Sequence, residues 1–279
     1  MTFQRALVWS IFWIGLSMLV ALGIYAFAGI APAEAFLTGY ALEKALSVDN
    51  LFVFLMLFTY FGVKREAQRR ALNFGLIGVL VLRGVLIFAG IALLRQFEWI
   101  LYLLGAVVIY TGFVMVRGGE KEFDPEKSRT VRLVSRFVTV SHTYHGSRFF
   151  IREAGRKIAT PLFLVVCVIE VMDVLFAVDS LPAIFAVTRD PFIIYSSNIL
   201  AVLGLRSLYF LLERMHDAFR FVKQGVGLIL WFIGVKMILP AFWPAAIIDN
   251  TVALAVVIAV LLAAIVLSVT VKRAKTNGA

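Results

Sequence analysis

Two apolar stretches of the sequence, residues 35–61 and 160–187, carry acidic side chains that could bind a cation. The five acids are Glu43, Asp49, Glu170, Asp173 and Asp179. Each stretch is long enough to cross a bilayer as a helix, and at about 1.5 Å per residue the acids fall inside the hydrocarbon layer. A charged side chain there costs at least about 2.5–3.5 kcal/mol. The five acids therefore need compensation from arginine, protons or a bound cation.

Two arginines also lie midway along apolar stretches. Arg83 lies in residues 71–94 and Arg206 in residues 193–212, and we assign both to charge balance. Five carboxylates against two arginines leave a deficit of three charges, which a divalent cation and some protonation would fill. A purely structural role in locking helices together explains a matched Asp–Arg pair better than this excess of acids. Lys44 lies nearer the outer end, and we expect its amine to extend toward the membrane surface.

The other polar groups near these acids are all oxygen donors. They are Ser47, Asn50, Ser180 and Asn198. The apolar stretches contain no histidine, and the single cysteine, Cys167, is expected to be a buried small hydrophobe. Sites built from oxygen suit Mg²⁺, Ca²⁺ and Mn²⁺, whereas Zn²⁺ and copper favour histidine or cysteine. The sequence therefore predicts a hard divalent cation without choosing among the three.

Helical geometry leaves two arrangements of the acids open. On an ideal helix Asp49 points away from the face that holds Glu43, and Asp179 points away from Asp173. Asp49 and Asp179 could join the same site if the helices unwind there, which Pro182 favours in the second stretch. Alternatively, Asp49 and Asp179 pair with the two arginines and leave the other face to the ion.

The two stretches begin matching halves of the chain. The segments "SVDNLFVF" and "AVDSLPAIF" align, and they also place Glu43 on Asp173. The next stretches bring "VLRGVLIF" and "GLRSLYFLL", which align Arg83 with Arg206, and the third bring "TGFVMV" and "IGVKMI". The first stretch of one half runs into the cell and that of the other runs out, so the halves form an inverted three-helix repeat. Such repeats are typical of transporters whose site lies at the repeat interface, near the bilayer midplane.

The apolar stretches predict an all-α polytopic membrane protein with about eight transmembrane helices. They are residues 7–30, 35–61, 71–94, 99–116, 160–187, 193–212, 221–239 and 250–271. With 62% hydrophobic residues, the chain has more apolar surface than a soluble fold can bury. No alternating pattern typical of an outer-membrane barrel strand is present. We expect one transmembrane domain, residues 1–279, with repeat halves at residues 35–116 and 160–239.

The basic residues predict the orientation. With eight spans, 21 of the 27 Lys and Arg residues fall on one side of the membrane, and only Arg95 and Arg189 fall on the other. The positive-inside rule makes the basic side cytoplasmic. We therefore expect a multi-pass protein of the cell inner (plasma) membrane with both termini in the cytoplasm. This distribution explains the net charge of +10 without nucleic acid as a partner.

The one long hydrophilic segment, residues 117–158, lies between the two halves. Its first part predicts a solvated linker, and "RTVRLVSRFVTV" predicts either a short amphipathic helix on the inner membrane surface or a charged loop. His142 and His145 in this segment, and His216 near Glu213 and Asp217, are expected to be solvated, although the acids could line an inner vestibule.

The segments "FLTGYALEKALSVDNLFVF" and "EVMDVLFAVDSLPAIFAVTRDPFIIYSSNILAVLGLRSLYFLL" closely resemble the TerC family of integral membrane proteins, over about residues 36–240. The resemblance is strongest to its Alx-type members, which are associated with manganese export. It implies export of Mn²⁺ from the cytoplasm. It also implies that the acidic motif residues of the family fall on the five acids named above, with Asn50 and Ser180 in the same motifs.

We expect a secondary transporter that exports Mn²⁺, with Ca²⁺ as the lesser candidate. Proton exchange is a reasonable mechanism, because carboxylates that release a cation can take up protons. No P-loop, Ser–His set or H-E-x-x-H motif is present, so neither an enzyme nor a bound cofactor is expected. The other partners would be the lipid bilayer, a second copy of the chain or membrane partner proteins. Two alternatives stay open: a membrane assembly factor that supplies metal to exported proteins, and a subunit of a tellurium-resistance or stress complex.

Overall fold

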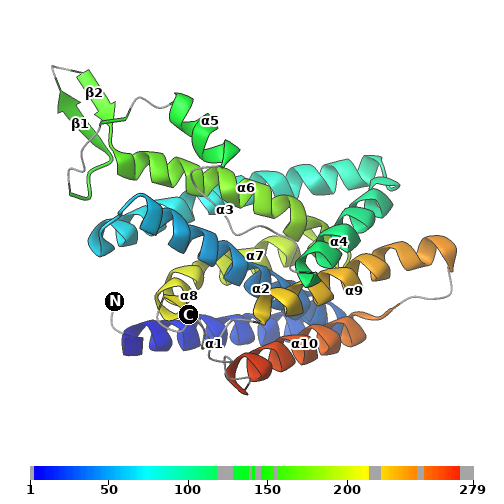
Figure 1. The fold of residues 1–279 in the computed structure, drawn as a ribbon. Coiled ribbons are helices and arrows are strands. Elements are labelled where there is room, and N and C mark those ends of the chain that lie inside the picture. Colours follow the sequence, from blue (N-terminus) through cyan, green and yellow to red (C-terminus); the bar gives the residue numbers. More distant parts are fainter. Residues whose placement is uncertain are drawn as a thin grey trace, which may run out of the picture.

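The computed structural model shows a bundle of long helices with a small hairpin at one end (Figure 1). It describes residues 3–117, 128–137, 140–141, 146–153, 156–213, 221–243 and 248–270. Within these ranges six side chains are not described: Asp49, Ser135, Phe137, Glu153, Arg156 and Asp179. The described elements are α1 (Phe3–Ala28), α2 (Ile30–Tyr60), α3 (Arg65–Gln96), α4 (Ile100–Val116), α5 (Arg129–Phe137), β1 (Phe150–Glu153), β2 (Arg156–Ala159), α6 (Pro161–Phe185), α7 (Pro191–Leu203), α8 (Leu205–Leu212), α9 (Val222–Phe242) and α10 (Asn250–Thr270).

Local sequence signals set the ends of the helices that carry the acids. α2 ends in a Schellman motif, in which the N–H of Gly62 donates to Thr59 O at 3.1 Å and the N–H of Val63 donates to Phe58 O at 2.9 Å. Gly62 has φ 61°, a conformation that glycine adopts without steric cost. The motif turns the chain so that α3 can return antiparallel to α2.

The start of α7 is fixed by Asp190. The carboxylate of Asp190 accepts hydrogen bonds from the N–H groups of Phe192 and Ile193 at 2.8 and 3.2 Å. Pro191 follows at the first helical position, where its missing N–H costs nothing. This cap sets where α7 begins and therefore how far into the bundle its polar residues reach.

The helices are apolar enough to identify an integral membrane protein. Within the described ranges, α1, α3, α6, α9 and α10 are each long and apolar enough to cross a membrane, and the bent pair α7–α8 makes a sixth candidate. α4 has 17 residues, and α2 is long but carries Glu34, Glu43, Lys44 and Asp49. The eight expected stretches coincide with these elements, while the number of spans stays a prediction.

The structure differs from the sequence expectation in three places. The expected single helix over residues 193–212 is broken at Gly204, where α7 and α8 meet at 40°. The unwinding that one of the two open arrangements requires near Asp49 and Asp179 is absent, because α2 and α6 stay helical there and α6 continues through Pro182. Residues 129–137 form a short helix, one of the two forms that the sequence left open, and residues 150–159 form an unexpected antiparallel hairpin that pairs Phe150 with Ala159.

Glycines let α4 and α9 cross with their backbones in contact. A Cβ on Gly105 would lie 3.4 Å from Gly234 O, and a Cβ on Gly112 would lie 2.6 Å from Gly227 O. Small residues at such crossings allow the close packing that holds membrane helices together. Elsewhere α2 packs on α7 and α3 packs on α6, so each major contact joins one predicted half to the other.

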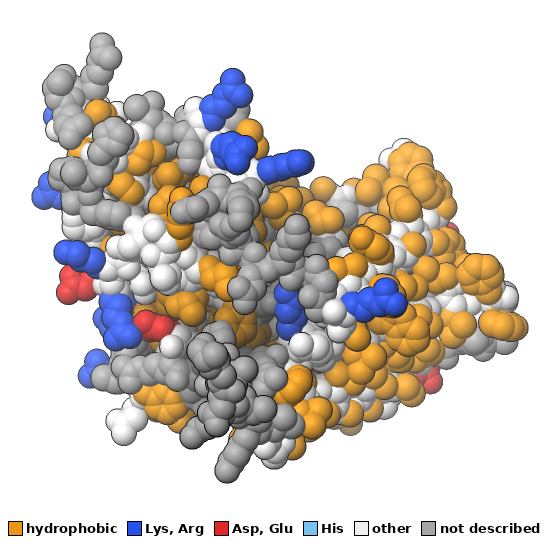
Figure 2. Space-filling model, in the orientation of Figure 1, with side chains coloured by type: hydrophobic (Ala, Val, Ile, Leu, Met, Phe, Trp, Pro, Cys, Tyr) orange, Lys and Arg blue, Asp and Glu red, His pale blue; other side chains and the backbone are white. Residues whose placement is uncertain are grey.

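Charged and apolar side chains separate on the surface. Figure 2 shows Lys and Arg side chains gathered over the end that carries α5, β1 and β2, with hydrophobic side chains covering much of the rest of this face. Leu19, Ile77 and Val269 are 61% to 67% exposed, as suits side chains that face lipid.

Candidate ion-binding site

A buried arginine joins the two predicted halves inside the bundle. Arg83 of α3 donates from Nε and Nη2 to the two carboxylate oxygens of Asp173 on α6, at 2.9 and 2.8 Å. Its Nη1 donates to Glu43 on α2. Arg83 is 1% exposed, Asp173 1% and Glu43 3%. The first-choice ion contacts from sequence, Glu43 and Asp173, are therefore brought together around one guanidinium.

Asn198 of α7 completes this cluster. Its amide Nδ2 donates to Glu43 Oε2 at 3.0 Å, and its Oδ1 accepts from Arg83 Nη1 at 3.3 Å. Ser47, one turn along α2, lies 3.5 Å from Glu43 Oε1. We call Glu43, Arg83, Asp173 and Asn198 the central cluster. Four helices, α2, α3, α6 and α7, each supply one of its members.

The central cluster has a net charge of −1 when both acids are ionised. Burying an ion costs several kcal/mol, which only good pairing and further hydrogen bonds offset. The bidentate contact with Asp173 provides that pairing. Asn198 supports both the remaining acid and the guanidinium. Within the described residues, Arg83 therefore lies between the two carboxylates and binds both.

Glu170, a predicted ligand, lies apart from the central cluster. Both of its carboxylate oxygens are buried and lack a hydrogen-bond partner among the described residues. It packs against α3 where Gly75 and Gly78 leave room, and a Cβ at Gly78 would overlap the carboxylate. The absence of a side chain at Gly78 is therefore what admits this acid.

The other predicted ligands are placed less fully. Asn50 and Ser180 are buried, 5% and 4% exposed, and no described hydrogen bond joins either to the central cluster. Asp49 and Asp179 lie on the helical backbones of α2 and α6, and their side chains are outside the described part of the chain. Among the described residues, no group of three or more His, Cys, Asp or Glu side chains could hold a metal ion. The ligand role of these residues stays a prediction.

The comparisons with known proteins agree with the membrane architecture. The family model described as "Integral membrane protein TerC family" matches residues 29–276. The chain belongs to the TerC family. No solved structure matches it.

Curated relatives of this TerC protein include bacterial and plant membrane proteins. A protein of Photorhabdus laumondii named "Putative membrane-bound redox modulator Alx" is 47% identical over 268 residues, which are 93% of this chain and 84% of that protein. The Alx protein of Escherichia coli K12, with the same name, is 45% identical over 251 residues, 87% of this chain and 78% of the relative. The "Thylakoid membrane protein TERC, chloroplastic" of Arabidopsis thaliana is 44% identical over 229 residues, 82% of this chain and 60% of the relative.

The second arginine of this TerC protein is held differently from the first. Arg206 of α8 donates from Nη1 to Asn73 Oδ1 at 2.9 Å, and its buried Nε has no partner among the described residues. The side chain of Asp49, the acid that could pair with Arg206, lies outside the described part of the chain, so that pairing stays a prediction. Among the described residues Glu43, Asp173 and Asn198 hold the guanidinium of Arg83. The side chain of Asp179 is not described, so the alternative in which it pairs with Arg83 stays untested.

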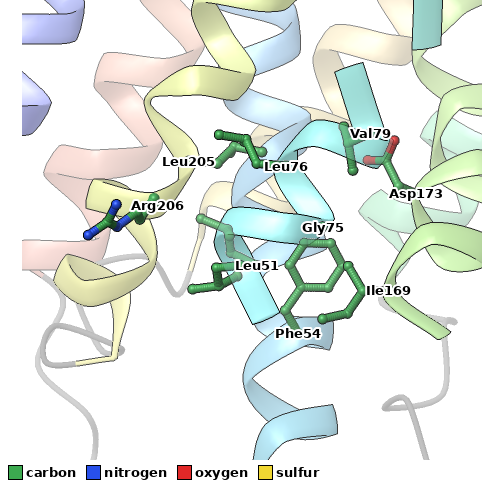
Figure 3. A pocket seen from close by; sticks show the side chains of 10 residues that line it. Leu51, Phe54, Gly75, Leu76, Val79, Ile169, Asp173, Leu205 and Arg206 are labelled. Atoms are coloured by element: carbon green, nitrogen blue, oxygen red, sulfur yellow. The ribbon is translucent and has the colours of Figure 1, made fainter. Parts of the chain in front are cut away.

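A small cavity lies between Arg206 and the central cluster. Its volume is about 20 Å³. Figure 3 shows Arg206 and Asp173 on opposite sides of it, with apolar side chains between them. Leu51, Phe54, Leu76 and other apolar groups line the rest. We call this space the inner cavity, because it faces the half of α3 that begins at Arg65, on the predicted cytoplasmic side.

Lys44 does not extend to the membrane surface as expected. Its Nζ donates to Ala201 O at 3.0 Å and lies against Gly204, where α7 gives way to α8. The carbonyl of Ala201 is one of those freed by the helix break, so the ammonium stabilises that break. No pattern in the sequence predicts this contact, because residues 44 and 201 are far apart along the chain.

Two asparagines of the site were not fully predicted from the sequence. Asn198 was named as an oxygen donor, but its place between Glu43 and Arg83 follows only from the packing of α7 on α2. Asn73 was not singled out at all, although it holds Arg206. A lone asparagine in an apolar stretch is the signal that could have found it.

The expected solvated histidines and the possible inner vestibule lie mostly outside the described residues, which do not include His142, His145, His216 or Asp217. The remaining acid of that group, Glu213, pairs with Arg65 at 2.9 Å.

Proposed function

We propose that this TerC protein exports a hard divalent cation, Mn²⁺ before Ca²⁺, from the cytoplasm as a secondary transporter. The observation that carries the proposal is the meeting of Glu43 and Asp173, one from each predicted half, at a single buried positive charge. Two buried carboxylates that share one monovalent partner are a natural place for a cation of higher charge. The amide oxygen of Asn198 and the hydroxyl of Ser47 lie next to the acids, and oxygen is the ligand atom that Mn²⁺ and Ca²⁺ prefer.

Transport in this proposal requires Arg83 to give up part of its contact with the acids. The guanidinium holds Glu43 and Asp173 together when no ion is bound, so their charges are never left without a partner. An arriving cation competes for the same oxygens. After the cation leaves, either Arg83 or protons restore the balance, which makes proton exchange a consistent driving force.

The direction of transport follows from the predicted topology. The end with α5, β1 and β2 carries the gathered basic side chains and would lie in the cytoplasm under the positive-inside rule. This places the inner cavity on the cytoplasmic side of Asp173. The protein would reside in the cell inner membrane, with both termini in the cytoplasm.

The names of the bacterial relatives refer to redox modulation, and this chain offers little for thiol chemistry of its own. Its 279 residues contain one cysteine, Cys167, which lies partly buried in α6. A disulfide switch needs two thiols, so these residues cannot form one within a chain. Metal export therefore fits the side chains of this protein better than dithiol exchange does.

The test is Mn²⁺ flux into and out of proteoliposomes, with and without a pH gradient. The purified chain would be compared with Asp173→Asn and Glu43→Gln, and with Asp49→Asn and Asp179→Asn, which test the two acids whose side chains are not described. Glu34→Gln is a matched control, because Glu34 lies on the same helix as Glu43 but bonds the hydroxyl of Thr251 at 2.8 Å.

We expect flux in the wild type and in Glu34→Gln, and its loss in Asp173→Asn and Glu43→Gln. Ca²⁺ in place of Mn²⁺ would show whether the site separates the two ions. A folded wild type that moves neither ion under either condition would overturn the proposal and favour the assembly-factor alternative.

A further inference from the structure

The two arginines that the sequence aligns are in unequal positions. Arg83 is enclosed by Glu43, Asp173 and Asn198 and is 1% exposed. Arg206 has one described hydrogen bond, to Asn73, and a buried Nε without a described partner. Both arginines are nevertheless close to the same acid, since Arg206 and Asp173 line the inner cavity together.

The crossing of α4 and α9 supports a two-fold relation between the halves. The aligned segments "TGFVMV" and "IGVKMI" place Gly112 on Gly234, and the same spacing places Gly105 on Gly227. In the structure Gly105 meets Gly234 and Gly112 meets Gly227. Exchanging each residue for its counterpart turns one contact into the other, as an axis that passes between the two helices requires. The pairing of α2 with α7 and of α3 with α6 follows the same rule.

This relation has a consequence for the central cluster. Exchanging each residue for its counterpart turns the pair Arg83–Asp173 into Arg206–Glu43, and the pair Arg83–Glu43 into Arg206–Asp173. The first arrangement is seen and the second is not. In transporters with inverted repeats, the two halves adopt each other's conformations when the site turns from one face of the membrane to the other. A single asymmetric structure then shows one of two states.

We propose that Arg83 and Arg206 exchange places on the Glu43–Asp173 pair when the protein changes from one membrane-facing state to the other. In the state seen, Arg83 pairs with both acids, and Arg206 lies across the inner cavity, hydrogen-bonded to Asn73. In the other state Arg206 crosses to the acids and Arg83 withdraws toward the opposite face. The acids keep a cationic partner in both states without cargo, which avoids an uncompensated buried charge.

The inference rests on the proposed transport function for its two states, and it makes Arg206 a positioning residue rather than an ion contact. The residues at one pair of aligned positions, 72 and 195, have different surroundings in the state seen. Leu72 lines the inner cavity, and its counterpart Tyr195 instead packs against α3, where a Cβ on Gly84 would lie 3.1 Å from its ring. The accessibility of positions 72 and 195 can therefore report whether the protein is open at the inner cavity or at the corresponding place in the other half.

The experiment measures the rate at which a small maleimide labels a single cysteine in the metal-free protein. The reporters are Leu72→Cys and Tyr195→Cys, each in a Cys167→Ala background. Arg206→Gln cannot complete the exchange, so we expect it to raise the ratio of labelling at position 72 to that at position 195. Arg83→Gln weakens the state seen, so we expect the ratio to fall. A shift of about tenfold in each direction is within the usual range of coupling between sites.

A milder variant covers the case in which Arg83→Gln fails to fold. Asn73→Leu removes the hydrogen bond that holds Arg206 away from the acids, so it should lower the ratio as Arg83→Gln does. Arg65→Gln is the control, because it removes an arginine from an exposed pair on the same helix and should leave the ratio unchanged. Shifts of Arg206→Gln and Asn73→Leu in the same direction, or no shift in Arg206→Gln, would overturn the exchange.

The readout uses no metal ion, so the exchange and the cargo are tested separately. If the labelling ratio shifts in opposite directions in the two arginine variants but no Mn²⁺ flux is measured, the exchange of the arginines is supported and Mn²⁺ is rejected as the transported ion. Flux that depends on Glu43 and Asp173, together with unchanged ratios, would keep the transporter and reject the exchange.

Discussion

Removal of the guanidinium of Arg83 should destabilise the bundle more than removal of any exposed arginine. In Arg83→Gln, Glu43 and Asp173 stay buried without the guanidinium that binds both of them, and the net charge of the central cluster changes from −1 to −2. Breaking a buried pair by removing one member costs about 3–5 kcal/mol, because the charge left behind is uncompensated. We expect a loss of that size in the free energy of unfolding.

The assay is reversible unfolding of the purified protein in mixed detergent micelles, followed by circular dichroism. Arg65→Gln is the matched control, because the side chain of Arg65 is 66% exposed and its pair with Glu213 is worth at most about 1 kcal/mol. A double variant with Asp173→Asn should recover part of the loss, since the second change removes one of the stranded charges.

The reasoning would be refuted if Arg83→Gln lost no more stability than Arg65→Gln. That result would mean that the central cluster is hydrated or that its acids are already protonated. Full additivity of the Arg83 and Asp173 substitutions would refute the bidentate contact as an energetic unit, because residues in contact show coupling of about 0.5–3 kcal/mol.

Glycine substitutions provide two further tests. Gly78→Ala places a methyl group on the carboxylate of Glu170 and should lower the free energy of unfolding by about 1–3 kcal/mol, whereas Gly75→Ala meets that carboxylate at 3.5 Å and should cost less; equal losses at the two positions would contradict the packing of Glu170 on α3. Gly112→Ala forces the backbones of α4 and α9 apart and should cost about as much or prevent folding. Gly15→Ala, with open space around it, is its control, and a measured loss at position 15 that matches position 112 would argue against the tight crossing.

Composition and periodicity were sufficient to predict the class of fold. Long apolar stretches can only be satisfied by helices in lipid, because a bilayer offers no partner for free backbone N–H and C=O groups. The helix positions followed for the same reason, whereas the helix at residues 129–137 was one of two forms that the sequence left open. The hairpin at residues 150–159 escaped prediction because short strands in a charged segment carry little periodic signal.

The break at Gly204 shows where a one-dimensional pattern is insufficient. Residues 193–212 are apolar throughout, so hydropathy predicts one helix. The break is stabilised by Lys44, from another helix, which donates a hydrogen bond to Ala201 O. Nothing local to residues 193–212 records that partner. The opposite error concerned Pro182, whose local signal favoured unwinding although α6 continues through it.

The sequence alone determined which residues are candidates for the site, because a charged side chain in an apolar helix is costly at any position and needs a compensating partner. It indicated Glu43 and Asp173 as ion contacts, assigned Arg83 and Arg206 to charge balance, and aligned the two arginines with each other. Only the tertiary structure decided that Arg83 bridges both acids while Arg206 stays with Asn73. Pairing across helices depends on which faces meet, and that is set by the packing of the whole bundle rather than by any spacing along the chain.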